Sequence, residues 1–282
     1  DTYGFPIDLT KEILEEEGFE IDEKAFNEEM KIQKERAREA RGKSTYMGAD
    51  ETVYHKLDVD MVTEFAGYDV KEVTDAKVLA IVAENEVSDS AVAGNEVSVF
   101  IDRTPFYAES GGQVGDKGII ETETGKIEVT DCIKVVGGKI AHIGKVVSGS
   151  ISKGDTVKAA IDYGYRMATS RNQSATHLLQ KALRTVLGTH VEQAGSYVDA
   201  ERLRFDFTHF SAMTTDEIKE VERIVNEKIF ENIDIKISEE NIEDARKMGA
   251  MALFGEKYGN VVRVVNMGGY SVELCGGAHL KN

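Results

Sequence analysis

The spacing of apolar residues changes twice along the chain, and this change limits the fold more than any other feature. Apolar residues follow a helical period over about the first 65 residues, alternate from about 70 to 163, and afterwards follow both patterns in turn. One segment cannot satisfy both periods, so we expect three regions, at residues 1–66, 67–164 and 165–282. Helices and strands that occupy separate regions are typical of an α+β fold.

The N-terminal region is predicted to be helical. Asp8 or Thr10 can cap a first helix that ends at Gly18, and a second helix is expected from about residue 22 to residue 40. The apolar stripe of this second helix is narrow and would bury little surface. We therefore expect the second helix to pack against another domain or against RNA.

The middle region contains short runs of alternating apolar and polar residues, separated by glycine-rich turns. Several short strands at regular spacing are typical of a small β-barrel, which is the architecture we predict. Cys132 lies in a similar pattern and is expected to be a small buried apolar residue. The runs are Val78–Val82, Val97–Ile101, Gly118–Ile120, Ile127–Val129 and Val157–Ile161.

The C-terminal region mixes helix and strand patterns. A helix is expected from about Ser170 to Leu187, with Gly188 as its end. Leu203–Phe207 alternates as a half-buried strand, and Thr214 with Glu217 predicts a capping box that opens another helix. A strand at 233–237, a helix near 239–254 and strands at 261–265 and 271–274 follow. These elements predict helices packed on an antiparallel sheet.

The formal net charge of −17 argues against indiscriminate binding to nucleic acid, because phosphate contacts require lysine and arginine. Two stretches are nevertheless basic. Residues 31–43 hold six Lys or Arg against two Glu, and residues 166–204 hold six Lys or Arg against three acidic residues. Such stretches suit a partner held at chosen phosphates, although solvated helix surfaces often carry the same residues.

Few side chains can bind a transition metal, since the chain has six histidines and two cysteines. Between Cys275 and His279, two glycines allow the backbone to fold a thiolate and an imidazole onto one ion. His177 is a further candidate, on a helix one turn after Gln173. Each pattern has an ordinary alternative: a chance pairing in a glycine-rich turn, and a polar residue on a helix surface. The remaining histidines lack partners at ligand spacing and are predicted to be structural or exposed; they are His55, His142, His190 and His209.

Several motifs resemble those of alanyl-tRNA synthetases and occur in the family's order. The opening DTYGFPIDLT looks like the linker after the aminoacylation domain, and Phe106–Asp116 looks like the glycine-rich motif of the family's barrel. Four segments resemble successive motifs of its editing domain: Ser174–Leu179, Gly188–Ser196, Leu203–Phe207 and Glu273–His279. The resemblance runs almost from end to end, and both ends of the chain look like cut points in a longer protein.

The resemblance implies a zinc site made by a His-x3-His pair and a Cys-x3-His pair. Carried over by position, the ligands are His177, Cys275 and His279, whereas Gln173 stands where the family has its first histidine. An amide oxygen is a poor zinc ligand, so Gln173 is a doubtful fourth ligand. Three protein ligands and an open position still suit a catalytic zinc.

The implied activity is hydrolysis of tRNA(Ala) that carries serine or glycine, by an editing domain over residues 165–282. The full enzyme attaches alanine with ATP and Mg²⁺ in a domain outside this chain. The expected catalytic residues are His177, Gln193 and Cys275, and Gln193 with a turn at Gly195–Ser196 is expected to line the amino-acid pocket. The expected partner is the aminoacylated 3′ end of tRNA(Ala), in the cytoplasm and away from membranes.

Two other functions fit the same motifs. One is a tRNA-binding module whose hydrolytic centre is impaired by Gln173, and the other is a free-standing deacylase, against which the linker-like opening argues. The glycine-rich Ser110–Gln113 is expected to form a barrel turn, with Gln113 as a weaker candidate for a contact to the tRNA end.

Some classes are excluded by the sequence. The chain has no apolar run of about 18 residues, no basic and apolar leader, and no glycine-rich loop typical of nucleotide sites. Two cysteines are too few for a disulfide framework, which fits a reducing compartment. An oligomer would depend on a C-terminal region that this chain lacks.

Overall fold

The computed structural model describes residues 14, 18–19, 21–26, 28–31, 51–251 and 259–282. The chain divides into two compact units, at residues 1–51 and 52–282, and each is considered by itself. In the first unit, residues 23–26 and 28–31 are helical, and Asp22 Oδ1 accepts a hydrogen bond from the amide of Ala25 at 2.9 Å. The predicted helix before Gly18, and most of the one over 22–40, lie outside the described residues.

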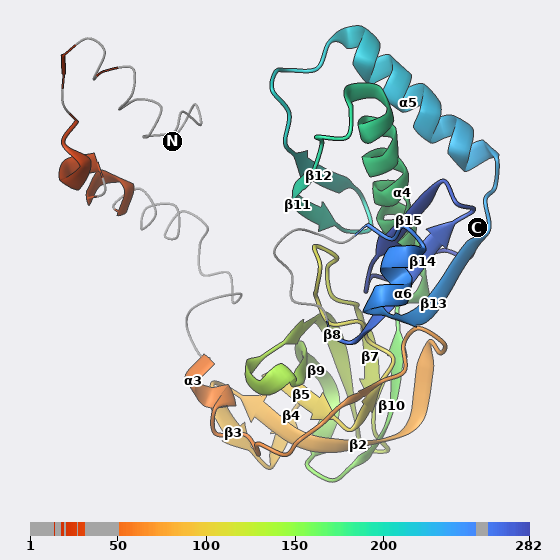
Figure 1. The fold of residues 1–282 in the computed structure, drawn as a ribbon. Coiled ribbons are helices and arrows are strands. Elements are labelled where there is room, and N and C mark those ends of the chain that lie inside the picture. Colours follow the sequence, from red (N-terminus) through yellow and green to blue (C-terminus); the bar gives the residue numbers. More distant parts are fainter. Residues whose placement is uncertain (1–13, 15–17, 20, 27, 32–50, 252–258) are drawn as a thin grey trace. The chain divides into compact units, whose positions relative to one another are not determined.

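The predicted β-barrel is confirmed in the second unit. Six strands are paired in the order β10-β7-β8-β9-β5-β2, and an antiparallel pairing of β2 with β10 closes the ring (Figure 1). Short strands flank it: β3 and β4 pair with β2 and β9, and β1 pairs in parallel with β6. The barrel strands are β2 (Glu72–Ala83), β5 (Glu96–Ile101), β7 (Gly118–Glu121), β8 (Gly125–Lys134), β9 (Ile140–Ser152) and β10 (Thr156–Ile161); the short ones are β1 (Glu64–Phe65), β3 (Glu86–Ser88), β4 (Ser90–Val92) and β6 (Arg103–Thr104).

The alternating strand residues point into the barrel and form its core. Val99, Ile101, Ile120 and Ile127 are buried there, together with Cys132, as its pattern predicts. Outside the ring, the short helix α3 (Glu51–Tyr54) and the turn after it place Val53 and Leu57 over Phe100. The wall of the barrel is therefore covered on this side by apolar residues.

The rest of the second unit packs helices on antiparallel strands, which confirms the α+β fold. The three-stranded sheet has the order β13-β14-β15, β11 and β12 form a separate hairpin, and α5 packs against α4 (Figure 1). The capping box of Thr214 and Glu217 opens α5 as predicted. The elements are α4 (Tyr163–Leu187), β11 (Gln193–Val198), β12 (Leu203–Phe207), α5 (Thr215–Phe230), β13 (Ile235–Asn241), α6 (Ile242–Lys247), β14 (Val261–Met267) and β15 (Ser271–Leu274).

Helix α4 is joined to the barrel by a buried arginine. Arg166 donates to Asp116 through Nε at 2.9 Å and also through Nη2, to Gly67 O at 2.7 Å, and to Pro105 O at 3.1 Å. Both charged side chains are almost fully buried, and three chain segments of the barrel region meet the guanidinium. This contact fixes where the helix leaves the barrel.

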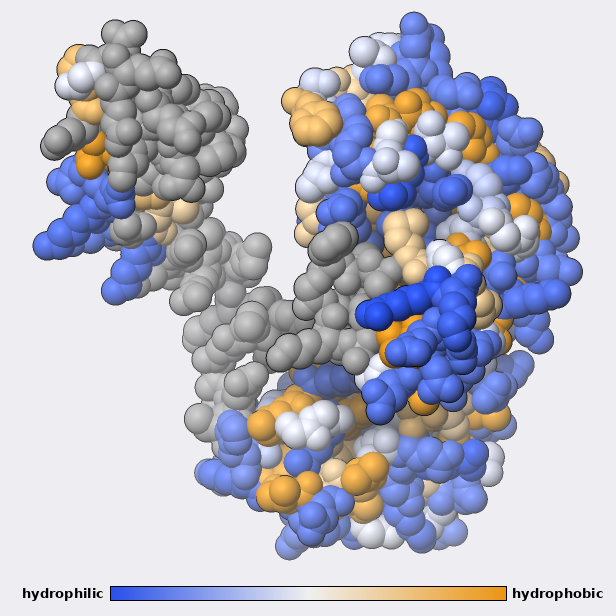
Figure 2. Space-filling model, viewed as in Figure 1, coloured by the Kyte–Doolittle hydropathy of each residue, from blue (hydrophilic) through white to orange (hydrophobic). Residues whose placement is uncertain are grey.

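Several predicted boundaries were wrong. Helix α4 begins seven residues before Ser170, because the Asp162 side chain caps it by accepting a hydrogen bond from Tyr165 N. The helix predicted near 239–254 is shorter, because β13 continues to Asn241 and α6 begins only at Ile242. Helix α6 buries Ala245, and its charged side chains face solvent. They form the blue patch over α6 in Figure 2. Residues 252–258 lie outside the described part. No helix in the described residues is long and apolar enough to cross a membrane.

Candidate functional site

One face of α4 carries a row of buried polar residues. Gln173, His177 and Gln180 are spaced by four and three residues, so their side chains lie on the same face of the helix. All three are at least nine-tenths buried. A helix face that buries polar groups requires partners. Gln173 donates to Cys275 in the loop that follows β15, His177 lies beside Glu273 of β15, and Gln180 donates to Met251 Sδ.

The loop over Cys275–His279 is held from three sides. Arg263 of β14 donates from Nη1 to Cys275 O at 2.9 Å and to Gly277 O at 2.8 Å. The Gln173 amide packs so closely that a Cβ on Gly277 would lie 2.7 Å from Nε2, which explains the glycine there. The barrel contributes Gln113, whose Oε1 accepts a hydrogen bond from the amide of Ala278 at 2.8 Å.

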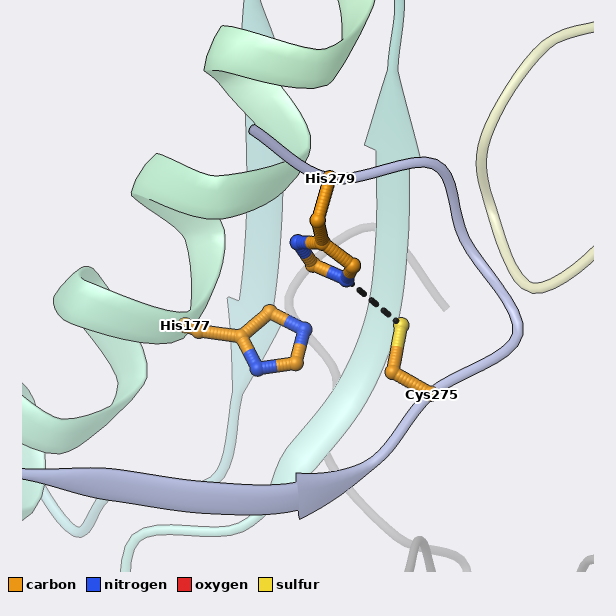
Figure 3. Close-up of side chains that lie close together, drawn as sticks. All are labelled: His177, Cys275 and His279. Carbon is orange, nitrogen blue, oxygen red and sulfur yellow. Dashed lines mark hydrogen bonds between the residues drawn. The ribbon is translucent and has the colours of Figure 1, made fainter. Parts of the chain in front are cut away.

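Three potential metal ligands converge where α4 meets this loop. One ligand atom each of His177, Cys275 and His279 lies within 4.8 Å of the other two. The Nε2 of His279 is 3.3 Å from Cys275 Sγ, and the two imidazole rings are edge to face with centroids 4.7 Å apart (Figure 3). Segments about a hundred positions apart are thus brought together, although their binding of a metal stays a prediction.

The two imidazoles change the acidity of the thiol. Burial would raise the pKa of Cys275, but the neighbouring imidazoles of His177 and His279 hold this pKa well below its ordinary value. Burial lowers the pKa of His279. For His177, burial lowers the pKa and the Glu273 carboxylate raises it, with a net rise. The centre therefore favours a thiolate, which is the form of cysteine that binds metals.

A second layer of polar groups orients the imidazoles. Ser174 Oγ lies 3.1 Å from His279 Nδ1. Glu273 Oε2 lies 3.2 Å from His177 Nδ1, within ion-pair distance but outside hydrogen-bond alignment. Glu273 itself accepts a hydrogen bond from Ser271 Oγ at 2.6 Å. In Figure 3 the Nε2 edge of the His177 ring faces the other two ligands, as these contacts at Nδ1 require.

The donor set fits zinc. One thiolate and two imidazoles match the sulfur and nitrogen ligands that zinc prefers, and ligands around a tetrahedral zinc lie about 3.5 Å apart. The 3.3 Å separation of Sγ and Nε2 in the Cys275–His279 pair agrees with this. Among the described residues no other group of three His, Cys, Asp or Glu meets the same criterion.

Gln173 lies beside the Cys275 thiol without adding a ligand to the three. Its Nε2 donates to Cys275 Sγ at 3.3 Å. Its Oε1 is buried and has no hydrogen-bond partner among the residues that the structure describes. The amide group that faces the thiolate is therefore a donor, which cannot coordinate a cation.

A cavity of about 40 Å³ opens beside His177 and Cys275. It is lined by Gln173 and His177 of α4, by Gln193 and Ser196, and by Gly111 of the barrel loop. The predicted turn at Gly195–Ser196 was wrong, because both residues lie in strand β11. Gln193 and Ser196 nevertheless line this space beside the centre.

The barrel loop Ser110–Gln113 is built into the site. Val198 donates its amide to Gly112 O at 2.8 Å, and a Cβ on Gly112 would lie 2.6 Å from Ser196 O. Gln113 is fully buried by these contacts and by its bond to Ala278. The weaker interpretation of Gln113 as a contact to the tRNA end is thus wrong, since its side chain is inaccessible.

The sequence missed the supporting residues Glu273, Ser174 and Gln113. A glutamate in a strand that is otherwise apolar was the one available signal for Glu273. Outside the centre, His142 is buried in the barrel, whereas His190 and His209 form a pair with Nε2 and Nδ1 2.9 Å apart. The basic stretch at 166–204 is not continuous, because Arg166 is buried and Arg204 pairs with Asp206.

Comparison with known proteins agrees with the motifs. The family described as tRNA synthetases class II (A) matches residues 1–165, and the threonyl and alanyl tRNA synthetase second additional domain matches residues 262–282. The chain is 57% identical over 279 residues to an alanine–tRNA ligase of Acetivibrio thermocellus, covering 99% of this chain and 32% of that protein.

Two further relatives give the same result. Alanine–tRNA ligase 1 of Lachnoclostridium phytofermentans is 53% identical and alanine–tRNA ligase of Clostridioides difficile is 54% identical, each over 100% of this chain and 32% of the relative. The chain thus spans about a third of the length of these relatives. Since the class II match covers more than half of the chain and the relatives match nearly all of it, the chain belongs to the alanyl-tRNA synthetase family.

Proposed function

We propose that residues 165–282 form an editing domain that hydrolyses the ester bond of tRNA(Ala) mischarged with serine or glycine. The observation that carries this proposal is the buried trio of His177, Cys275 and His279 beside a small cavity. Residues 1–66 would serve tRNA recognition and 67–164 would form the barrel domain. The parent enzyme would attach alanine to tRNA(Ala) in the cytoplasm, using ATP and Mg²⁺ in a domain outside this chain.

The need for such a site follows from the chemistry of alanine. Glycine lacks one methyl group, which changes binding by only about 1–3 kcal/mol. Serine adds one hydroxyl, which an apolar pocket also rejects weakly. A second site with different walls is the physical solution, and the cavity beside the centre has polar side chains such as Gln193 in its lining.

We propose zinc as the cofactor, held by His177, Cys275 and His279. When bound there, zinc would supply Lewis-acid polarisation or a nucleophilic water. The chain prepares the site by stabilising the thiolate form of Cys275. Ser174 Oγ lies beside Nδ1 of His279 and the Glu273 carboxylate lies 3.2 Å from Nδ1 of His177, which leaves each Nε2 to face inward. Gln193 is proposed to contact the aminoacyl group from the opposite wall.

The size of the cavity supports a small substrate. Its volume of about 40 Å³ exceeds the roughly 10–15 Å³ that admits one water molecule, so it has room for a small side chain such as that of serine.

A second candidate function is tRNA binding without hydrolysis. It is favoured by Gln173, which faces the thiolate with a donor instead of a fourth ligand. A free-standing deacylase is less favoured, because ligases match the chain over 99–100% of its length.

Metal analysis and deacylation of Ser-tRNA(Ala) by the purified chain test the proposal. We expect about one zinc per chain and release of serine. If the zinc-loaded protein binds tRNA but leaves the ester intact, the tRNA-binding function is the correct one. Hydrolysis that persists after complete removal of the metal would contradict the zinc assignment.

A further inference from the structure

Phe210 is the most exposed large apolar side chain among the described residues. Its ring is 88% exposed, yet it has a defined seat on the imidazole of His190, with ring centroids 4.6 Å apart and planes 25° apart. His190 is held in turn by His209, whose Nδ1 lies 2.9 Å from His190 Nε2. We call these three rings the aromatic cluster. The Phe210 ring buries little surface in the fold, so its face is open to a ligand.

The backbone holds the aromatic cluster beside the cavity of the centre. Thr208 donates its amide to Glu192 O at 2.9 Å, and Glu192 donates its amide to Thr208 Oγ1 at 3.1 Å. Glu192 precedes Gln193, which lines the cavity, and Thr208 precedes His209. Three residues span at most about 11 Å, so the Cα atoms of His190 and Gln193 lie within that distance of each other. The aromatic cluster and the cavity are therefore neighbours.

The charge around the aromatic cluster favours a neutral ligand over a phosphate. Glu192 is exposed, two residues after His190. Hydrogen bonds from Thr214, together with the charge of the nearby His209, lower the pKa of Glu217, so a second carboxylate lies close to the rings. Carboxylates repel a phosphate, whereas the π-face of a nucleic-acid base carries no net charge.

We propose that the aromatic cluster is a stacking platform for the base of the tRNA nucleotide that carries the aminoacyl ester. This inference rests on the proposed editing function and adds a contact to the RNA outside the cavity. The ester and the base are attached to the same ribose, so this ribose can direct the ester toward Gln193 while the base lies on Phe210. Unpaired bases at the ends of RNA are commonly held by stacking on aromatic side chains.

Stacking on Phe210 does not depend on the amino acid. The contact should hold uncharged, correctly charged and mischarged tRNA equally, because every base has a π-face and the amino acid lies elsewhere. An uncharged RNA is therefore a sufficient probe. Its binding requires neither hydrolysis nor a metal ion.

The test uses the full chain and an uncharged RNA hairpin with the acceptor stem of tRNA(Ala), in which 2-aminopurine replaces the terminal adenine. The fluorescence of 2-aminopurine is quenched when its ring stacks on another ring. We expect the bound probe to fluoresce less with the wild type and with Phe210→Tyr than with Phe210→Ala. Phe210→Ala should also bind the probe about 5–100-fold more weakly, whereas Phe210→Tyr should bind it like the wild type.

Phe230→Ala is the matched control, because Phe230 is 87% exposed but is the last residue of α5. Phe210 precedes this helix, whose 16 residues span about 24 Å. The control thus removes an equally exposed ring from the far end of the helix. We expect it to bind the probe with the affinity and the fluorescence of the wild type.

Two results would overturn the inference: equal probe affinity and fluorescence for the wild type and Phe210→Ala, or equal losses in Phe210→Ala and Phe230→Ala. Self-association that Phe210→Ala removes, with probe binding unchanged, would assign the ring to a second copy of the chain instead. A chain that stacks the probe on Phe210 but releases no serine from Ser-tRNA(Ala) would refute the editing function alone. Release of serine with the same KM in the wild type and Phe210→Ala would refute the stacking platform alone.

Discussion

The barrel and the candidate centre each bury a histidine against another ring, but the contacts of the ring nitrogens differ. In the barrel, His142 packs edge to face on Phe106, donates from Nδ1 to Val99 O at 2.9 Å, and accepts from Thr104 Oγ1 at 2.7 Å. In the centre, His177 packs edge to face on His279, and its Nε2 is directed toward Cys275 and His279.

The two places differ in whether their buried polar atoms have hydrogen-bond partners. Both His142 nitrogens are satisfied within the barrel, so the group contributes to stability and needs no ligand. The centre instead retains an unpaired acceptor on Gln173 and a thiol whose pKa is well below the ordinary value. Unpaired groups of this kind destabilise the folded protein unless a ligand binds them. The comparison indicates which buried polar cluster is built for folding and which for binding.

Substitution of the two cysteines should give the largest effect, a difference in zinc affinity between a change in the centre and a change in the barrel. Cys275→Ala should lower zinc affinity by more than about 100-fold, since loss of even an outer-shell partner costs about 10–100-fold. It should abolish release of serine from Ser-tRNA(Ala). Cys132→Ala should keep one zinc per chain, because Cys132 is buried in the barrel. Competition with a chromogenic chelator measures both, and equal zinc affinities in the two variants would refute the comparison.

Next in size is the arginine that joins the two regions. Arg166→Met leaves Asp116 buried without its partner, and we expect the free energy of unfolding to fall by about 3–5 kcal/mol. Arg223→Met on α5 is the control, because its ion pairs with Glu220 and Glu227 are exposed and should contribute less than about 1 kcal/mol. Urea denaturation measures both variants. A similar loss in each would mean that Arg166 does not anchor α4.

The barrel histidine predicts a pH dependence. Burial lowers the pKa of His142 from 6.5 to about 4. Between these values the unfolded chain binds a proton and the folded chain does not, so stability falls as pH decreases from 6.5 to 4. The full effect is about 3 kcal/mol, set by the difference between these two pKa values. The nearest titratable neighbour across the strands, Cys132, stays neutral because burial raises its pKa.

Urea denaturation of the wild type and of His142→Gln, between pH 6.5 and pH 4, isolates this contribution. The variant lacks the titrating ring but keeps a donor and an acceptor, so its stability should decline less over the same range. Parallel curves for the two proteins would show that His142 does not carry the effect.

The smallest expected effect is a change in zinc affinity when Gln173 is replaced. Gln173→His replaces an amide donor with an imidazole, and we expect zinc affinity to rise about tenfold through a fourth nitrogen ligand. Chelator competition measures the affinity of the wild type and the variant. Weaker zinc binding by the variant would contradict the placement of position 173 beside the three ligands.

Much of the fold follows from periodicity, but one barrel strand does not. Five barrel strands were predicted from alternating apolar residues, whereas β9 was missed. At Gly144 a Cβ would overlap the carbonyl oxygen of Glu128, and Gly149 has φ +65° and faces Thr124 O. Closing a small barrel requires glycine at such close approaches, and these glycines interrupt the alternation that marks a strand.

The site was predictable only in part. Spacing alone left His177, Cys275 and His279 open to ordinary interpretations, and the resemblance to a family selected them. The supporting contacts of Gln113 and Ser174 join residues 165 and 105 positions apart. No local pattern encodes such a contact, since it depends on the packing of the barrel loop and α4 around the last strand.

X-ray absorption spectroscopy at the zinc edge tests the central claim most directly. The account predicts one zinc per chain, with one sulfur at about 2.3 Å, two imidazole nitrogens at about 2.0 Å, and a remaining position filled by a light atom. A zinc shell without sulfur, or a protein that binds no zinc when the metal is supplied in excess, would contradict it.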